Sequence, residues 1–172
     1  MTAGALVLLS LIALAGLALA LRGERRGATG GAVALGVALA VAGGLAWLGT
    51  GGAGAVQAGA VLALLAAVAG GGPVATAVLH AADPAATGVS GGPQDPDILR
   101  GGAWIGVLER TAIAATLLAG WPEGLAVILA VKGLGRFSEL RAPAAAERFI
   151  VGTLASALWA VACVGVVALL RS

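Results

Sequence analysis

Long apolar runs set the main limit on what this chain can fold into. They cover about residues 3–21, 31–48, 55–79 and 147–170 of a 172-residue sequence. A helix that crosses the hydrocarbon core of a bilayer needs about 20 predominantly apolar residues. Because 60% of the residues are apolar and 10% are charged, the composition favours an all-α integral membrane protein over a soluble domain.

Two further apolar arms, about residues 103–118 and 125–134, are shorter and meet at a Gly-Trp-Pro-Glu-Gly turn over 120–124. Short arms interrupted by glycine and proline are one indication of a site inside a membrane. We therefore expect about six hydrophobic helical segments. The fourth and fifth form a short-armed hairpin, which either spans as two thin helices or re-enters the membrane from one side.

A segment rich in proline, glycine and aspartate divides the sequence into two parts. Its composition is typical of a solvated connection. The predicted organisation is a three-helix uncharged membrane half over 1–80, a cytoplasmic linker over 81–101, and a second half over 102–172. The second half holds the charged hairpin and one long final helix.

The basic residues predict the orientation, because cytoplasmic loops carry an excess of lysine and arginine. With an external N-terminus, all of them except Arg110 and Arg171 fall on or near the cytoplasmic side: Arg22, Arg25, Arg26, Arg100, Lys132, Arg136, Arg141 and Arg148. Both termini are then external. The richness in alanine, glycine and arginine suggests a GC-rich bacterial genome, and hence a bacterial plasma membrane.

Glu109 and Arg110 stand inside the fourth apolar segment, where an ionisable group is costly unless it is paired, hydrated or functional. On the returning arm, Lys132, Arg136 and Glu139 share one helical face. If the arms are antiparallel, Glu109 comes within reach of Lys132 and Arg136, which predicts a buried ion pair. The predicted intramembrane polar cluster comprises Glu109, Arg110, Lys132, Arg136, Glu139 and Arg148.

Three interpretations of Glu109 and Arg110 stay open. They form a structural ion pair that fixes helix register, or they belong to a shallow helix whose arginine snorkels to the interface, or they serve transport, proton relay or ligand binding. Lys132 is either a cytoplasmic anchor or a group that titrates when desolvated.

The sequence contains 29 glycines, and packing of small residues holds helices together in lipid. Two stripes are predicted to pack in this way. The first consists of Gly102, Gly106 and Thr116, with Ile113 interrupting it, and the second consists of Gly152, Ser156 and Ala160.

Three segments of the second half carry a resemblance to known sequences: GAWIGVLER at 102–110, AVKGLGRFSEL at 130–140 and AERFIVGTLAS at 146–156. Over about residues 101–156 the chain resembles a family of small bacterial membrane proteins without an assigned function. The resemblance implies a shared helical pattern and no activity. Separately, Gly-Pro-Val-Ala at 72–75 is similar to the last helix of the small G subunit of multisubunit cation/proton antiporters, although the polar motif expected between that subunit's first two helices is missing.

Enzyme signatures such as Gly-x-Ser-x-Gly, His-Glu-x-x-His or a phosphate-binding loop are absent from the sequence. One cysteine and one histidine supply no metal-binding cluster, so no cofactor is expected. A net charge of +2 beside membrane segments does not indicate nucleic-acid binding. The predicted function is a scaffold or accessory subunit that contacts membrane lipid and a membrane-protein partner or a second copy. The alternative is a small transporter or ion- or proton-conducting protein using Glu109, Lys132 and Arg136.

Overall fold

The computed structural model describes residues 1–22, 28–82, 102–137 and 143–172. Within these ranges all regular structure is helical: α1 (Thr2–Arg22), α2 (Ala28–Trp47), α3 (Ala53–Ala82), α4 (Gly102–Leu118), α5 (Gly124–Gly135) and α6 (Pro143–Arg171). In the described chain, α1, α2, α3 and α6 are each long and apolar enough to cross a membrane. For the residues that the structure describes, the prediction of an all-helical chain with about six helices is confirmed.

The helices follow the apolar runs closely, with one clear difference in α6. This helix begins at Pro143, four residues before the expected start at Glu147. Proline suits the first position of a helix because its fixed φ is already helical and its missing N–H is not needed there. The predicted linker falls outside the described ranges from residue 83 onward, and so do Arg25, Arg26, Glu139 and Arg141.

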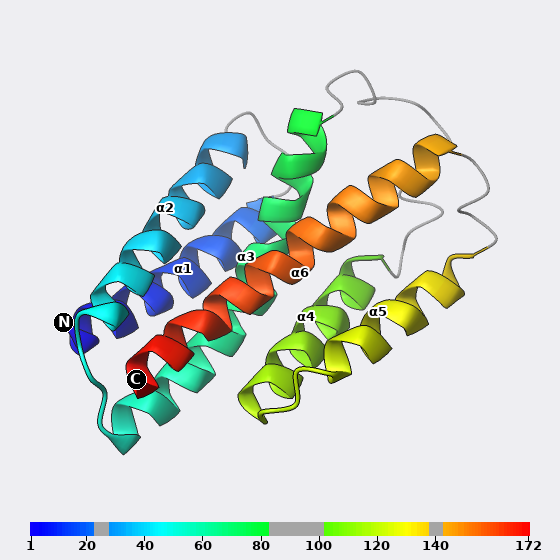
Figure 1. Ribbon diagram of the computed structural model, residues 1–172. Helices are drawn as coiled ribbons and strands as arrows, with labels where there is room; N and C mark the ends of the chain where they lie inside the picture. The colour runs from blue at the N-terminus through cyan, green and yellow to red at the C-terminus, as the bar shows by residue number, and fades with distance from the viewer. Residues whose placement is uncertain (23–27, 83–101, 138–142) are drawn as a thin grey trace.

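Helix α3 is the centre of the bundle and packs against α1, α2, α4 and α6 (Figure 1). Its long contact with α6 joins the two halves of the sequence into one helical body. Among the described helices, α5 packs only against α4, so it lies at the edge of the bundle. The charged hairpin is therefore attached to the bundle mainly through α4.

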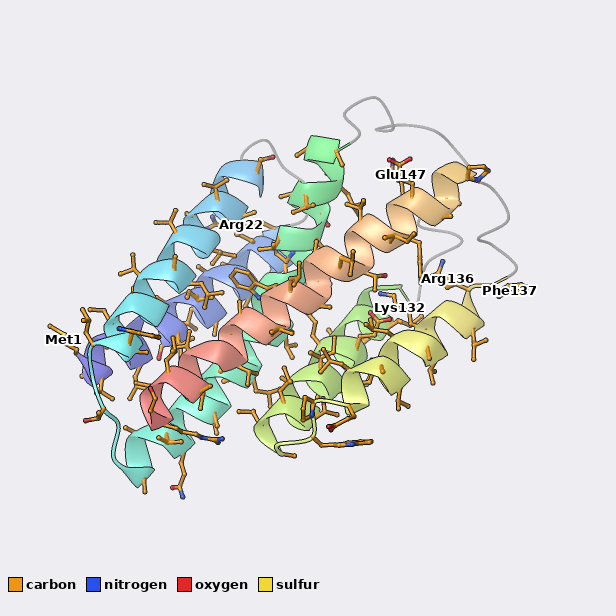
Figure 2. All side chains as sticks on the ribbon, in the orientation of Figure 1. Met1, Arg22, Lys132, Arg136, Phe137 and Glu147 are labelled. Carbon is orange, nitrogen blue, oxygen red and sulfur yellow. The ribbon has the colours of Figure 1, made fainter. Side chains whose placement is uncertain are left out.

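The two chain termini lie at the same end of the bundle (Figure 1). Hydrogen bonds tie this end together: Thr2 Oγ1 donates to the carbonyl of Thr50 at 3.0 Å, and the amide of Gly51 donates to the carbonyl of Leu170 at 3.0 Å. Arg136 and Glu147 lie toward the opposite end from Met1 (Figure 2).

Small residues bring the helices close together. A Cβ atom on Gly16 of α1 would lie 2.7 Å from the backbone nitrogen of Gly70 in α3, so this crossing requires glycine. The adjoining core of α3 is made of the fully buried Ala63, Ala66 and Ala67. Because side chains this small leave the backbones near one another, dispersion contacts can hold the helices together without bulky core residues.

The turn between α4 and α5 is built by Gly120, whose φ is +75°. Its amide donates to the carbonyl of Leu117 at 3.1 Å, and the amide of Trp121 donates to that of Thr116 at 2.8 Å. This pair of bonds is the Schellman ending of a helix, which favours glycine at the left-handed position. Gly124 then starts α5 directly against Thr116, where a Cβ would lie 2.6 Å from the threonine methyl.

Candidate functional site

Arg110 is buried between three helices, with 6% of its surface exposed. Its Nε donates to the carbonyl of Val68 in α3 at 3.1 Å, and its Nη1 donates to Ser156 Oγ in α6 at 3.3 Å. A buried cation is tolerated only where its donors find acceptors, since desolvation otherwise costs several kcal/mol. The guanidinium therefore joins α4 to both α3 and α6.

A glycine run in α3 makes room for this side chain. Residues 70–72 are Gly-Gly-Gly and are followed by Pro73 inside the helix. A Cβ on Gly71 would overlap Cδ of Arg110, whereas a Cβ on Gly72 would be in ordinary contact with Nη2 at 3.9 Å. The proline has no N–H to donate within the helix, and α3 changes direction along its length in Figure 1. The missing side chains let Arg110 reach the backbone of α3.

Trp159 of α6 uses the same stretch of α3. Its Nε1 donates to the carbonyl of Ala66 at 3.1 Å, and the residue is 6% exposed. A Cβ on Gly70 would lie 2.6 Å from the indole ring. Side chains from two different helices therefore donate to backbone carbonyls only two residues apart in α3, those of Ala66 and Val68.

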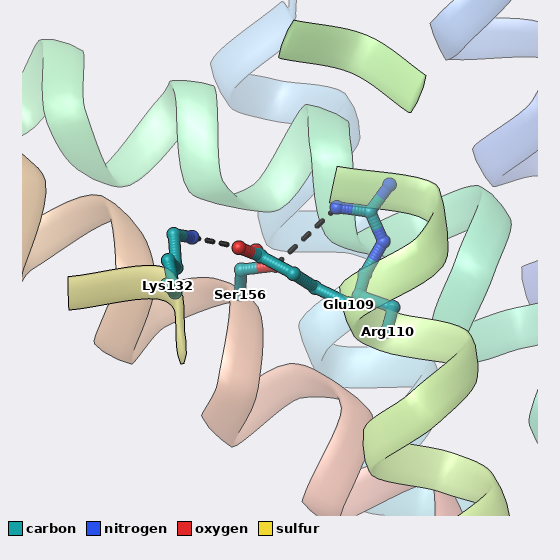
Figure 3. Close-up of polar contacts among 4 residues, drawn as sticks. All are labelled: Glu109, Arg110, Lys132 and Ser156. Atoms are coloured by element: carbon teal, nitrogen blue, oxygen red, sulfur yellow. Dashed lines mark hydrogen bonds and ion pairs between the residues drawn. The ribbon is translucent and has the colours of Figure 1, made fainter. Parts of the chain in front are cut away.

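Glu109 points away from Arg110, toward α5 (Figure 3). Lys132 Nζ donates to Glu109 Oε2 at 2.6 Å, in a salt bridge whose side chains are 14% exposed for the glutamate and 20% for the lysine. The ammonium also lies 5.6 Å from the ring centroid of Phe149 in α6, which is a cation–π distance. Lys132 thus links the edge helix α5 both to α4 and to α6.

The second carboxylate oxygen of Glu109, Oε1, is buried and has no hydrogen-bond partner among the described residues. A buried carboxylate oxygen without a donor is costly, so such an atom is a natural place for a water, a proton or a ligand. Over the described residues, it is the one buried side-chain nitrogen or oxygen atom that lacks a hydrogen-bond partner.

Two members of the predicted cluster, Glu109 and Arg110, take different partners: Glu109 pairs with Lys132, whereas Arg110 bonds to Val68 and Ser156. The Glu109–Lys132 pair forms, but no salt bridge joins Glu109 to Arg110 or to Arg136, although all four residues are described. The snorkelling interpretation of Arg110 is wrong, because the side chain turns inward to acceptors on two helices. Arg136 and Arg148 each make an interaction of their own.

The predicted packing residues take different roles. Thr116 contacts the start of α5, and the guanidinium of Arg110 lies over Gly106, where a Cβ would be 3.0 Å from Nη1. A Cβ on Gly152 would lie 3.2 Å from Cδ1 of Leu79 in α3, Ser156 accepts from Arg110, and Ala160 is fully buried. Gly102 starts α4.

Sequence reasoning missed Gly70, Gly71, Trp159 and Phe149. The run Gly-Gly-Gly-Pro in an apolar helix was the available signal, because glycines there mark a close approach of another group. For Trp159 and Phe149 the signal was weak, since aromatic residues in an apolar helix usually pack without polar partners.

No protein-family model, no curated protein and no solved structure matches the chain significantly. The resemblance of the second half to a family of small bacterial membrane proteins, and that of α3 to an antiporter subunit, therefore stay predictions.

Proposed function

We propose that this chain is a multi-pass scaffold or accessory subunit of a bacterial plasma membrane, with both termini outside. The helix lengths and the shared end of the two termini support this orientation, as do Arg22, Lys132 and Arg136, which lie toward the other end. In this arrangement the α4–α5 hairpin enters and leaves from the cytoplasmic side.

The observation that carries the proposal is the placement of Arg110. Its guanidinium donates hydrogen bonds to α3 and α6 inside the bundle, and Gly71 of α3 leaves room for the aliphatic part of the side chain. A side chain held in this way fixes the register of three helices and is unsuited to moving a substrate. Arginine also stays protonated, so it cannot relay a proton.

The Glu109–Lys132 pair supports the same structural role. It closes α5 onto α4, and the cation–π contact with Phe149 adds a link to α6. Since α5 packs against no helix but α4 in the described chain, these contacts help to keep α5 in place at the edge of the bundle.

A scaffold needs a surface for its partner, and α2 with α6 offers one. A groove of about 490 Å³ runs between them, lined by Gly36, Leu39, Ala40, Gly43, Ala162, Gly165, Val166 and Leu169. Small residues of this kind let another membrane helix approach closely.

Light scattering of the purified protein in detergent micelles tests the scaffold proposal. We expect a defined homo-oligomer or a stable complex, and we expect Gly43→Leu to disrupt it by filling the groove. Gly44→Leu is the matched control, since a Cβ on either glycine would meet no described atom within 4 Å, but Gly44 does not line the groove. A protein that is monomeric at every concentration and purifies without a partner contradicts the proposal.

Transport remains a second candidate because Glu109 Oε1 is buried without a donor. A carboxylate in that state is suited to binding a proton or a cation. Glu109→Gln should then abolish a proton- or ion-dependent flux in proteoliposomes while the variant still folds into the helical bundle. Absence of flux in the wild-type protein under every imposed gradient removes this candidate.

A further inference from the structure

The α4–α5 hairpin is shorter than the helices that surround it. At about 1.5 Å per residue, the 12 residues of α5 span about 18 Å, whereas the 21 residues of α1 span about 31 Å. The hydrocarbon core of a typical bilayer is about 30 Å thick. Because α5 lies at the edge of the bundle, lipid on that face meets a helix far too short for an ordinary bilayer.

The contacts of Arg110 fix the level of the hairpin along the bundle. Its partner Ser156 is about 22 Å from the end of α6 at Arg171, at about 1.5 Å per residue. From Arg110 to the end of α4 at Leu118 is about 12 Å by the same measure. By this measure the turn stops about 10 Å short of the end that holds the chain termini. Figure 1 likewise shows the α4–α5 turn ending before that end of the bundle.

The turn nevertheless carries residues that belong at a membrane surface. Trp121 is 53% exposed, Glu123 is exposed, and Trp104 near the other end of α4 is 71% exposed. Tryptophan prefers the headgroup level, and an exposed carboxylate avoids hydrocarbon. The two tryptophans are about 25 Å apart along the hairpin at about 1.5 Å per residue, which is a narrow spacing for two interfaces.

We propose that the hairpin face binds a locally thinned bilayer. Phospholipid headgroups and water of the outer leaflet reach inward to Trp121 and Glu123, about 10 Å below the level at which they meet α1 and α2. Thinning is a known response of a bilayer to a short apolar segment. The inference rests on the membrane embedding in the proposed function, but it does not require the scaffold role.

Nitroxide labels on single cysteines test this inference in dioleoylphosphatidylcholine vesicles. Cys163→Ala removes the only native thiol, and Ala119→Cys places a label at the exposed side of the turn while Glu123 stays intact. Val37→Cys in the middle of α2 reports the bilayer centre, and Thr50→Cys in the α2–α3 loop reports the outer surface. Collision rates with oxygen, which prefers lipid, and with a water-soluble nickel chelate give the depth of each label.

We expect the label at 119 to collide with the nickel chelate at a rate within about twofold of the label at 50. A label at 119 that is accessible to oxygen and shielded from nickel, as at 37, overturns the proposal. A label shielded from both also overturns it, because protein then covers the turn.

Two controls keep the outcome clear. If Ala119→Cys does not fold, Pro122→Cys, at another exposed position of the turn that leaves Glu123 intact, must give the surface pattern instead. A deep pattern there overturns the proposal. A label at 37 that collides freely with nickel contradicts the membrane embedding itself, which separates that failure from the failure of thinning alone.

Discussion

Gly71→Ala is the sharpest test of how Arg110 is held. The new Cβ would overlap Cδ of Arg110 and would lie 2.9 Å from Nε of the same side chain. It would also lie 3.2 Å from Cδ1 of Trp159. The arginine cannot move aside cheaply, since it is 6% exposed and bonded to Val68 and Ser156. Adding one methyl group should therefore displace a buried charge from its acceptors.

The expected cost follows from two effects. Overpacking a tight contact costs about 1–3 kcal/mol, and loss of one hydrogen bond from a charged group costs about 1.5–3 kcal/mol. Gly71→Ala should thus lower the free energy of unfolding by about 2–4 kcal/mol, because the two effects partly replace each other. For a chain of this size that corresponds to a melting temperature lower by about 5–15 °C.

The sequence supplies both the reporter and the control for this measurement. Cys163 is the only cysteine and is fully buried, so a thiol-reactive fluorophore reports unfolding during a thermal scan in detergent. Gly72→Ala is the matched control, because its Cβ meets only Nη2 of Arg110 at 3.9 Å. It should be neutral, or stabilising by up to about 1 kcal/mol through helix propensity.

A melting temperature of Gly71→Ala within about 1 °C of wild type would show that Arg110 does not need the space left by Gly71. An equal loss of stability in Gly71→Ala and Gly72→Ala would show the same. A double-mutant cycle with Arg110→Ala adds a second check. Once the long side chain is gone, Gly71→Ala should cost much less than it does in the wild-type background.

Other predictions follow from the same contacts, and the same thermal assay measures each. Gly16→Ala should lower the free energy of unfolding by about 1–3 kcal/mol because its Cβ meets the backbone of α3. Gly30→Ala is the control, with no described atom within 4 Å of its Cβ, and should leave stability unchanged. Equal effects would refute the close crossing of α1 and α3. Trp159→Phe removes a buried donor and should cost about 1–2 kcal/mol, so an unchanged melting temperature would contradict that bond. Phe149→Leu should cost about 0.5–1 kcal/mol through the lost cation–π contact, and that cost should vanish in a Lys132→Met background.

The helices could be predicted from the sequence because long apolar runs leave few alternatives in lipid. The Glu109–Lys132 pair could be predicted as well, since antiparallel arms joined by a short turn bring residues at equal distances from the turn to one level. Both inferences depend on local spacing alone.

The direction taken by Arg110 could not be predicted in this way. The acceptors of Arg110 are in α3 and α6, and both helices lie outside the hairpin. The spacing of residues within the hairpin therefore does not predict which way the side chain turns. The sequence does show three glycines before Pro73, but the side chain that fills the space they leave comes from another helix. The same holds for Trp159, whose acceptor in α3 is fixed by tertiary packing.

The central claim is that the charges of the hairpin act as structural pairs, and exchanging Glu109 with Lys132 tests it most directly. Glu109→Lys and Lys132→Glu should each lower the free energy of unfolding by about 3 kcal/mol or more, because each leaves like charges together in a largely buried site. The double variant should recover most of the lost melting temperature, short of wild type because Phe149 then faces a carboxylate. A double variant no more stable than the worse single variant would contradict the claim.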